Sequence, residues 1–502
     1  MLQANRTENT TIDPSIETLL SNVNIPDEPQ ERLSVFEDLI IDYALHVVLK
    51  QSFPSVTNYF DFLLNSSPTL RFTLKNRLGQ AGIKALAGVA TVMLKGVDSQ
   101  TIKRALPGVM AMFMHHLLEV VSDKLDADQV AKALNTPEEL NEVFSGMAYE
   151  LLGGMPFDNV AIRFTNYLQE SCLRELNLPA VVPAYASVID MNQSGQFVQM
   201  AASAGVEIDD NQLSEFLKHP IKHFLTLNLQ VIGNARDQLE SAMTLTDDGS
   251  LRTTGQAVLY EFGMQGLCAR YYANSITQDL GYADMPLDQA IEVRSFTILT
   301  NYTMAAVISA LAATDENIWE SVENDRFLIE SAIGDATRLI GLANDCGSRI
   351  LRMNERDIYK EIAKLIRLDK SAGPRNNPAI KSLLDDARAG KLAPQYHALF
   401  PLIKDSGKGE TNMAYDLELS LDEDHWERVI YNVQMMAREF QRLEVDLIDQ
   451  LHQIQLPYIA DLIANFVNYN FQIYDIGADY DHARPVIEQL PIIQSNQNAT
   501  VA

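Results

Sequence analysis

The feature that most constrains the fold is the spacing of apolar residues along the chain. From residue 31 onward they recur at steps of three and four residues in nearly every segment. This spacing places them on one face of an α-helix, because a helix turns once in about 3.6 residues. Alternating, β-branched runs bounded by hairpin turns are nearly absent. The sequence therefore predicts an all-α protein. Two stripes of this kind are Val35, Leu39, Ile40, Tyr43 and Val47, and Phe440, Leu443, Leu447 and Leu451.

The charge of the chain argues against several classes of protein. Its 502 residues include 39 basic and 67 acidic side chains, which gives a formal net charge of −28. A nucleic-acid partner requires a basic face, and anionic lipid repels so acidic a chain. The longest apolar stretches, 85–94 and 106–114, are too short to cross a bilayer. We therefore expect no nucleic-acid partner and no stable membrane insertion.

Cysteine usage and the first residues favour a cytoplasmic location. Cys172, Cys268 and Cys346 lie far apart, with no CxxC pattern or Cys/His pairing. Neither a disulfide framework nor a zinc site is indicated, which is typical of a reducing compartment. The first twenty residues are polar and acidic, unlike a signal peptide.

Breaks in the helical pattern suggest the organisation of the chain. Residues 1–28 are polar and carry two prolines, which predicts a flexible N-terminal segment. The Gly-Gly-Met-Pro sequence at 153–156 divides an N-terminal helical region, 29–153, from an α domain, 154–490. The Gln/Asn-rich residues 491–502 are expected to be a disordered tail. Further loops are predicted at 246–249, 373–378 and 404–410.

One stretch carries a possible metal site. Residues 342–352, LANDCGSRILR, are expected to form one helix that presents Asn344, Ser348 and Arg352 on one face, because they are four residues apart. An amide oxygen, a hydroxyl and a third group in such a row can hold a divalent cation. The layout resembles the second metal motif of class I terpene synthases, NDxxSxxxE. The final Glu of that motif is replaced here by Arg352.

Two further stretches, in the same order as in that family, support the resemblance. Residues 286–297 end in the pattern RxxT, about 50 residues before Asn344. The resemblance implies that Arg294 of this pattern senses the substrate diphosphate. Residues 473–480 lie where the family ends with an Arg-Tyr pair; Tyr480 fits, and Asp479 replaces the Arg. The resemblance covers about residues 230–480 and implies a terpene synthase-like helical bundle, with an additional N-terminal helical region.

The first metal motif of the family, DDxxD, has two imperfect counterparts. Residues 236–240 read R-D-x-x-E, which leaves Asp237 and Glu240 as ligands and places Arg236 at the first position. The other counterpart is Asp209-Asp210. The favoured interpretation of this pair is structural, with Asp209 as the N-cap of a helix and Gln212 completing a capping box.

The resemblance implies an enzyme, a carbon–oxygen lyase. It would ionise a prenyl diphosphate and cyclise or rearrange it with loss of diphosphate. An arginine offers only donors, so it cannot bind a cation, but it grips phosphate oxygens directly. Magnesium is therefore expected in reduced number or not at all, with Glu355 as a substitute third ligand. The implied metal ligands are Asn344, Ser348, Asp237 and Glu240, and the implied catalytic residues are Arg294, Arg236, Arg352 and Tyr480.

Two alternatives remain open at the sequence level. The chain could be a non-catalytic isoprenoid-binding or structural protein on the same fold. It could also be an enzyme of different chemistry that uses a dismantled metal site, since a fold does not fix a function. In either case Arg352 would be a solvated residue on a helix surface. The sequence leaves open the substrate length, the product, the role of the N-terminal region and the oligomeric state, a homodimer included.

Overall fold

The computed structural model describes one long part of the chain and several short ones. The long part is residues 281–476, apart from 299, 376, 409–410 and 420–423. The short ones are residues 20–43, 84–110 and 196–212, apart from 21, 107 and 210, with scattered positions between 54 and 62 and between 262 and 273. These residues are mostly helical and include no strand, so the all-α prediction is confirmed for the part of the chain that is described.

The chain divides into two compact units. Unit 1 comprises residues 1–91, 97–260 and 306–323, and unit 2 comprises residues 92–96, 261–305 and 324–502. The predicted boundary at 153–156 lies outside the described residues and stays a prediction. So do the predicted segment 1–28 as a whole and the predicted tail 491–502.

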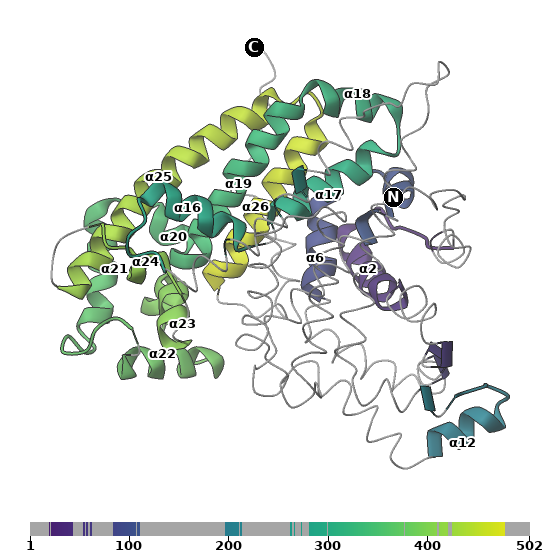
Figure 1. Ribbon diagram of the computed structural model, residues 1–502, viewed down its shortest axis with the longest axis horizontal. Coiled ribbons are helices and arrows are strands. Elements are labelled where there is room, and N and C mark those ends of the chain that lie inside the picture. Colours follow the sequence, from purple (N-terminus) through teal and green to yellow (C-terminus); the bar gives the residue numbers. More distant parts are fainter. Residues whose placement is uncertain are drawn as a thin grey trace, which may run out of the picture. The chain divides into compact units, whose positions relative to one another are not determined.

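Unit 2 is built around helix α19 (Arg326–Cys346), which packs against three other helices: α16 (Leu287–Phe296), α25 (His425–Gln453) and α26 (Pro457–Ile476) (Figure 1). Its inward residues recur at helical spacing and are fully buried, among them Ile333, Ala336 and Ile340. The stripe predicted on α25 is buried as well, with Phe440, Leu443, Leu447 and Leu451 at most 2% exposed. The packed apolar faces thus fix the position of both ends of α19.

Shorter helices of unit 2 begin at polar caps. The side chains of Asn354, Asn377 and Asn412 each accept a hydrogen bond from a backbone N–H of the helix they precede, and Asp424 does the same for α25. Such a cap satisfies a donor that the first turn of a helix leaves without a partner. The shorter elements are α20 (Ser348–Leu351), α21 (Glu355–Ile366), α22 (Pro378–Arg388), the 3-10 helix η3 (Pro394–Leu399), α23 (Phe400–Lys408) and α24 (Met413–Asp416).

The described helices of unit 1 and its margins are α2 (Pro29–Tyr43), α6 (Lys84–Met93), α12 (Gln196–Ser203) and α18 (Glu316–Asn324), with α17 (Thr300–Ala312) shared between the two units. In α2 the predicted stripe is confirmed for Leu39, Ile40 and Tyr43, which are at most 3% exposed, whereas Val35 is only partly buried. Val47 lies outside the described residues. No single described helix is long and apolar enough to cross a membrane, although the bent pair α16 and α17 passes the same test by length and composition.

Of the predicted loops, 373–378 is confirmed for 373–375 and 377, which precede α22, whereas Pro378 already belongs to that helix. Residues 246–249 lie outside the described part of the chain. The prediction of a loop at 404–410 is wrong for residues 404–408, because α23 continues through Lys408, and residues 409–410 lie outside the described part of the chain. Two contacts hold this part as a helix. The hydroxyl of Ser406 donates to the carbonyl of Pro374, and Gly407 lies so close to Leu384 of α22 that a Cβ would meet its side chain at 2.7 Å. The helix carries Lys404 and Asp405 to the end of α19.

The packing around α25 predicts a large effect of truncating its central aromatic residue. Phe440 is fully buried, and its ring centroid lies 5.4 Å from that of Phe471. We expect Phe440→Ala to lower the free energy of unfolding by about 3–5 kcal/mol, from lost burial and the cavity left behind. Val445→Ala on the same helix is the control, because Val445 is 58% exposed and should change stability by less than about 0.5 kcal/mol. Chemical denaturation measures the free energy of unfolding of both variants. Equal losses of stability in Phe440→Ala and Val445→Ala would contradict the central position of Phe440 in the core.

Candidate functional site

The three stretches on which the resemblance rests meet at the C-terminal end of α19. Arg294 of α16 binds Asp345 of α19, with Nε and Nη2 at 2.8 and 2.6 Å from Oδ1. Asp475, near the end of α26, accepts a hydrogen bond of 2.6 Å from the hydroxyl of Ser348. Segments separated by 51 and 127 residues are therefore joined by direct polar contacts.

The carboxylate of Asp345 is fully buried and has partners on both oxygens. Its second oxygen, Oδ2, accepts a hydrogen bond of 2.9 Å from the backbone N–H of Met413. Burial raises the pKa of Asp345, while the nearby Arg294 guanidinium and the Met413 N–H act in the opposite direction. Burial would lower the pKa of Arg294, but Asp345 raises it overall, so the guanidinium stays charged. A buried charge requires such partners, because an isolated one is strongly unfavourable.

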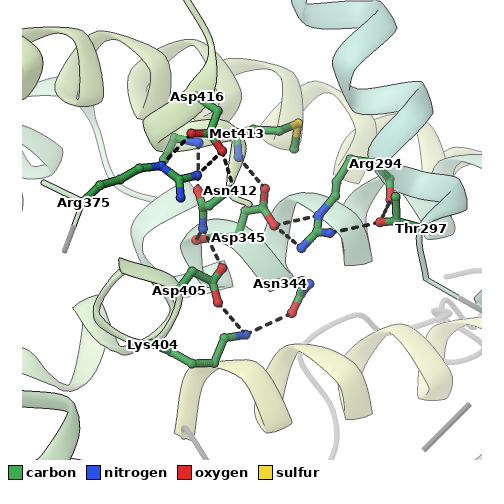
Figure 2. Close-up of polar contacts among 11 residues, drawn as sticks. Arg294, Thr297, Asn344, Asp345, Arg375, Lys404, Asp405, Asn412, Met413 and Asp416 are labelled. Atoms are coloured by element: carbon green, nitrogen blue, oxygen red, sulfur yellow. Dashed lines mark hydrogen bonds and ion pairs between the residues drawn. The ribbon is translucent and has the colours of Figure 1, made fainter. Parts of the chain in front are cut away.

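A wider polar network continues from this pair (Figure 2). The side-chain amide of Asn412 donates to the backbone carbonyl of Asp345 at 2.8 Å and to Oδ2 of Asp405 at 2.7 Å. Asp405 in turn lies 3.1 Å from the ammonium of Lys404. A further ion pair, between Arg375 and Asp416, lies beside Asn412, whose backbone N–H donates to the same Asp416. Each of the three cations in the network thus has a carboxylate partner.

The expectation of one continuous helix over 342–352 is wrong. Helix α19 ends at Cys346, and α20 begins at Ser348 after Gly347, which has φ 82° and ψ 138°. Only glycine adopts such a φ readily, and a Cβ at this position would lie 3.2 Å from both Oδ1 of Asp475 and Cγ of Pro401. Asn344 and Ser348 therefore belong to different helices and do not form one row.

Two side chains replace the hydrogen bonds that the break removes. In a continuous helix the N–H of Arg349 would donate to the carbonyl of Asp345. That N–H instead donates to Oδ1 of Asp475 at 3.3 Å, and the carbonyl accepts from Asn412. The break is thus satisfied on both sides by residues distant in sequence.

Arg352 is engaged within the protein. Its guanidinium donates to Ser348 Oγ at 3.0 Å and pairs with Glu444 at 2.7 Å. It also lies over the rings of Phe440 and Phe471, 5.6 and 5.1 Å from their centroids, which is a cation–π geometry. The interpretation of Arg352 as a solvated surface residue is therefore wrong.

Glu355 does not take over the role suggested for it as a third ligand. It lies in the first turn of α21, is half exposed and pairs with Arg438 of α25. The side-chain oxygens of Asn344 and Ser348, which the resemblance implies as magnesium ligands, have other partners in this structure. The Asn344 oxygen faces the ammonium of Lys404 at 3.5 Å, and Ser348 donates its proton to Asp475. Within the described residues, no group of three or more His, Cys, Asp or Glu side chains could hold a metal ion.

The remaining predicted site residues, Arg236, Asp237, Glu240 and Tyr480, lie outside the described residues and stay predictions, as does the replacement at Asp479.

Asp209, the other counterpart of the first motif, acts as a cap and accepts hydrogen bonds from the N–H groups of Asn211 and Gln212. The capping box is not completed, because Oε1 of Gln212 accepts from the backbone of Ser55.

Sequence reasoning gave no role to most residues of the network, namely Asp345, Arg375, Lys404, Asp405, Asn412 and Asp416. It also missed Asp475, the partner of Ser348. A helix start at Asn412 was open to prediction, because asparagine before an apolar helical turn is a common N-cap. Asp475 stood inside one of the stretches that carried the resemblance, but its partner Ser348 lies 127 residues away. No local pattern signals such a contact.

Comparison with known proteins gives no relative of this chain: no protein-family model matches it, and neither a curated protein nor a solved structure does. The class that the structure supports is therefore the broad one, an all-α protein in its described part, with a buried ionic network at the end of α19.

The buried pair predicts a strong effect of removing one partner. Arg294→Met leaves Asp345 buried and without its cation, so we expect the free energy of unfolding to fall by about 3–5 kcal/mol. Adding Asp345→Asn removes the uncompensated charge and should restore part of that loss. Arg438→Met is the matched control, because its pair with Glu355 is exposed and should contribute about 1 kcal/mol or less. Denaturant unfolding of Arg294→Met, Asp345→Asn and the double variant measures this coupling. If the two single losses of stability simply add up in the double variant, the two side chains do not interact directly.

Asp475 predicts a pH-dependent contribution to stability. Burial raises its pKa, although bonds from Ser348 and Arg349 act in the opposite direction. A carboxyl whose pKa is higher in the folded state contributes stability below its unfolded pKa of about 3.9, and that contribution is lost as pH rises through the folded pKa. Relative to wild type, Asp475→Asn should therefore gain stability as pH rises above about 4. Unfolding of both proteins across this pH range measures the difference in stability between Asp475→Asn and wild type. A difference that does not change with pH would contradict the prediction.

Proposed function

We propose that unit 2 binds a prenyl diphosphate and acts as a carbon–oxygen lyase on it, with diphosphate as the leaving group. The observation that supports this most is that the three resembling stretches, distant in sequence, meet at one end of α19. A resemblance produced by chance would give no reason for Arg294, Ser348 and residues 473–476 to lie around one helix end.

The proposed role of Arg294 is to recognise the diphosphate. All three nitrogens of its guanidinium have a partner: Asp345 binds Nε and Nη2, and Thr297 accepts from Nη1 at 3.0 Å. The side chain is 14% exposed, and Nη1 and Nη2 each carry a second N–H. A guanidinium fixed in this way can donate two parallel hydrogen bonds to phosphate oxygens, and it stabilises charge that develops on a departing diphosphate.

A second candidate function, a non-catalytic isoprenoid-binding or structural role, is favoured by a different observation. The cations around α19 and α20 are paired with carboxylates: Arg294 with Asp345, Lys404 with Asp405, and Arg352 with Glu444. Such pairs neutralise much of the positive charge that an anionic substrate would need. In this alternative the network serves to hold α16, α19 and the start of α24 together.

Release of diphosphate separates the two functions. The folded protein is incubated with geranyl, farnesyl and geranylgeranyl diphosphates, with and without magnesium, and diphosphate release is measured. We expect release from at least one substrate, and about a hundredfold lower rate for Arg294→Lys, which keeps the charge beside Asp345 but loses the planar fork. Arg338→Lys is the control, since Arg338 is also an ion-paired arginine: it lies on α19 and binds Glu292 and Asp335.

Substrate binding without release would favour the non-catalytic function, and neither binding nor release would reject both. An equal loss of rate in Arg294→Lys and Arg338→Lys would show that Arg294 acts through the stability of the helix end only.

A further inference from the structure

The ammonium of Lys404 lies among oxygen atoms at the end of α19. Its Nζ is 3.1 Å from Oδ1 of Asp405 and 3.5 Å from Oδ1 of Asn344. Figure 2 shows both contacts as dashed lines. Asp405 is only 2% exposed, and its other oxygen accepts a hydrogen bond of 2.7 Å from Asn412. A carboxylate and an amide oxygen thus face the same positive charge.

Carboxylate and amide oxygens are also the ligands that hard divalent cations take in proteins. Asn344 is moreover the residue to which the resemblance gives a metal. We propose that the ammonium of Lys404 occupies the place of a divalent cation between Asn344 and Asp405, so that this chain holds the phosphate group of its ligand with a built-in cation. The ligand class, a diphosphate ester, rests on the proposed function, whereas the place of the ammonium rests on the geometry.

Lys404 fits this role better than Arg352, which stands at the expected ligand position in the sequence. Arg352 lies beyond the break at Gly347 and is bound to Glu444 and Ser348. The Lys404 side chain is on α23, beside Asn344, and is 22% exposed. An ammonium binds phosphate as a point charge and needs no planar fork, so partial exposure suffices for contact with an anion.

Removal of Lys404 should turn its place into a cation site. In Lys404→Ala, the nearly buried carboxylate of Asp405 loses its ion pair with Lys404, and a positive ion that enters the vacated space restores that interaction. With manganese as the probe, we expect the variant to bind one ion at least tenfold more tightly than wild type. The ion should also raise the unfolding temperature of the variant more than that of wild type, because it binds only the folded state. Adding Asn344→Ala to Lys404→Ala should remove most of the gain in manganese affinity.

Paramagnetic resonance and thermal unfolding measure the two effects. Equal manganese binding by wild type and Lys404→Ala would overturn the proposed place of the ammonium. A wild-type manganese site that Asn344→Ala abolishes would overturn it too, because the ion and the ammonium would then not compete.

Binding of inorganic diphosphate in the presence of EDTA tests the second half of the proposal. Calorimetry should detect binding to wild type, a loss of about tenfold or more in Lys404→Gln, and partial recovery in Lys404→Arg. Lys381→Gln is the control, because Lys381 is an exposed lysine of the neighbouring helix α22. The double variant Lys404→Gln/Asp405→Asn removes both charges, so it should fold and still lose the affinity.

The outcomes separate this inference from the proposed function. Binding of diphosphate only with magnesium, or unchanged affinity in both Lys404 variants, would overturn the inference and leave the lyase proposal standing. If diphosphate fails to bind under any condition and no prenyl diphosphate is cleaved, the proposed function fails together with the phosphate half of the inference. The manganese experiment would then still test whether the ammonium of Lys404 occupies the place of a divalent cation.

Discussion

The burial of one carboxylate determines much of unit 2. Asp345 lies at the end of α19 with no exposure to solvent, so each of its oxygens must be matched inside the protein. Arg294 and the N–H of Met413 supply those partners. Because the partners come from α16 and from the start of α24, the positions of both elements follow from the position of a single side chain. The contacts of Asn412, Asp405 and Lys404 then extend from this point.

The helices were open to prediction from the sequence because their cause is local. The stripe from Phe440 to Leu451 is a repeat of apolar residues at helical spacing, and it is buried as expected. The cap at Asp209 likewise depends on residues within three positions of it. In each case neighbours along the chain determine the conformation, so a pattern read over one or two turns is sufficient.

The site was predicted less well because its causes are not local. The resemblance gave roles in one site to Arg294 and to Asn344, but it did not predict that Arg294 would bind Asp345, the neighbour of Asn344. The NDxxS pattern suggested an unbroken helix, since neither the positive φ of Gly347 nor its contact with Asp475 can be read from adjacent residues. Lys404 was assigned to a loop because Ser406 and Gly407 are typical of one, yet their contacts with Pro374 and Leu384 hold them in a helix.

The break at Gly347 has a consequence for any attempt to rebuild the family motif in this chain. Arg352→Glu would restore the missing letter of NDxxSxxxE, but the new carboxylate would face Glu444, which now binds Arg352. It would also remain at the C-cap of α20, on the far side of the break from Asn344. A working row would need Gly347, Asp475 and Glu444 to change together. A single Arg352→Glu substitution would therefore not give a working NDxxSxxxE row in this chain, because Glu444, Ser348 and two aromatic rings surround the arginine.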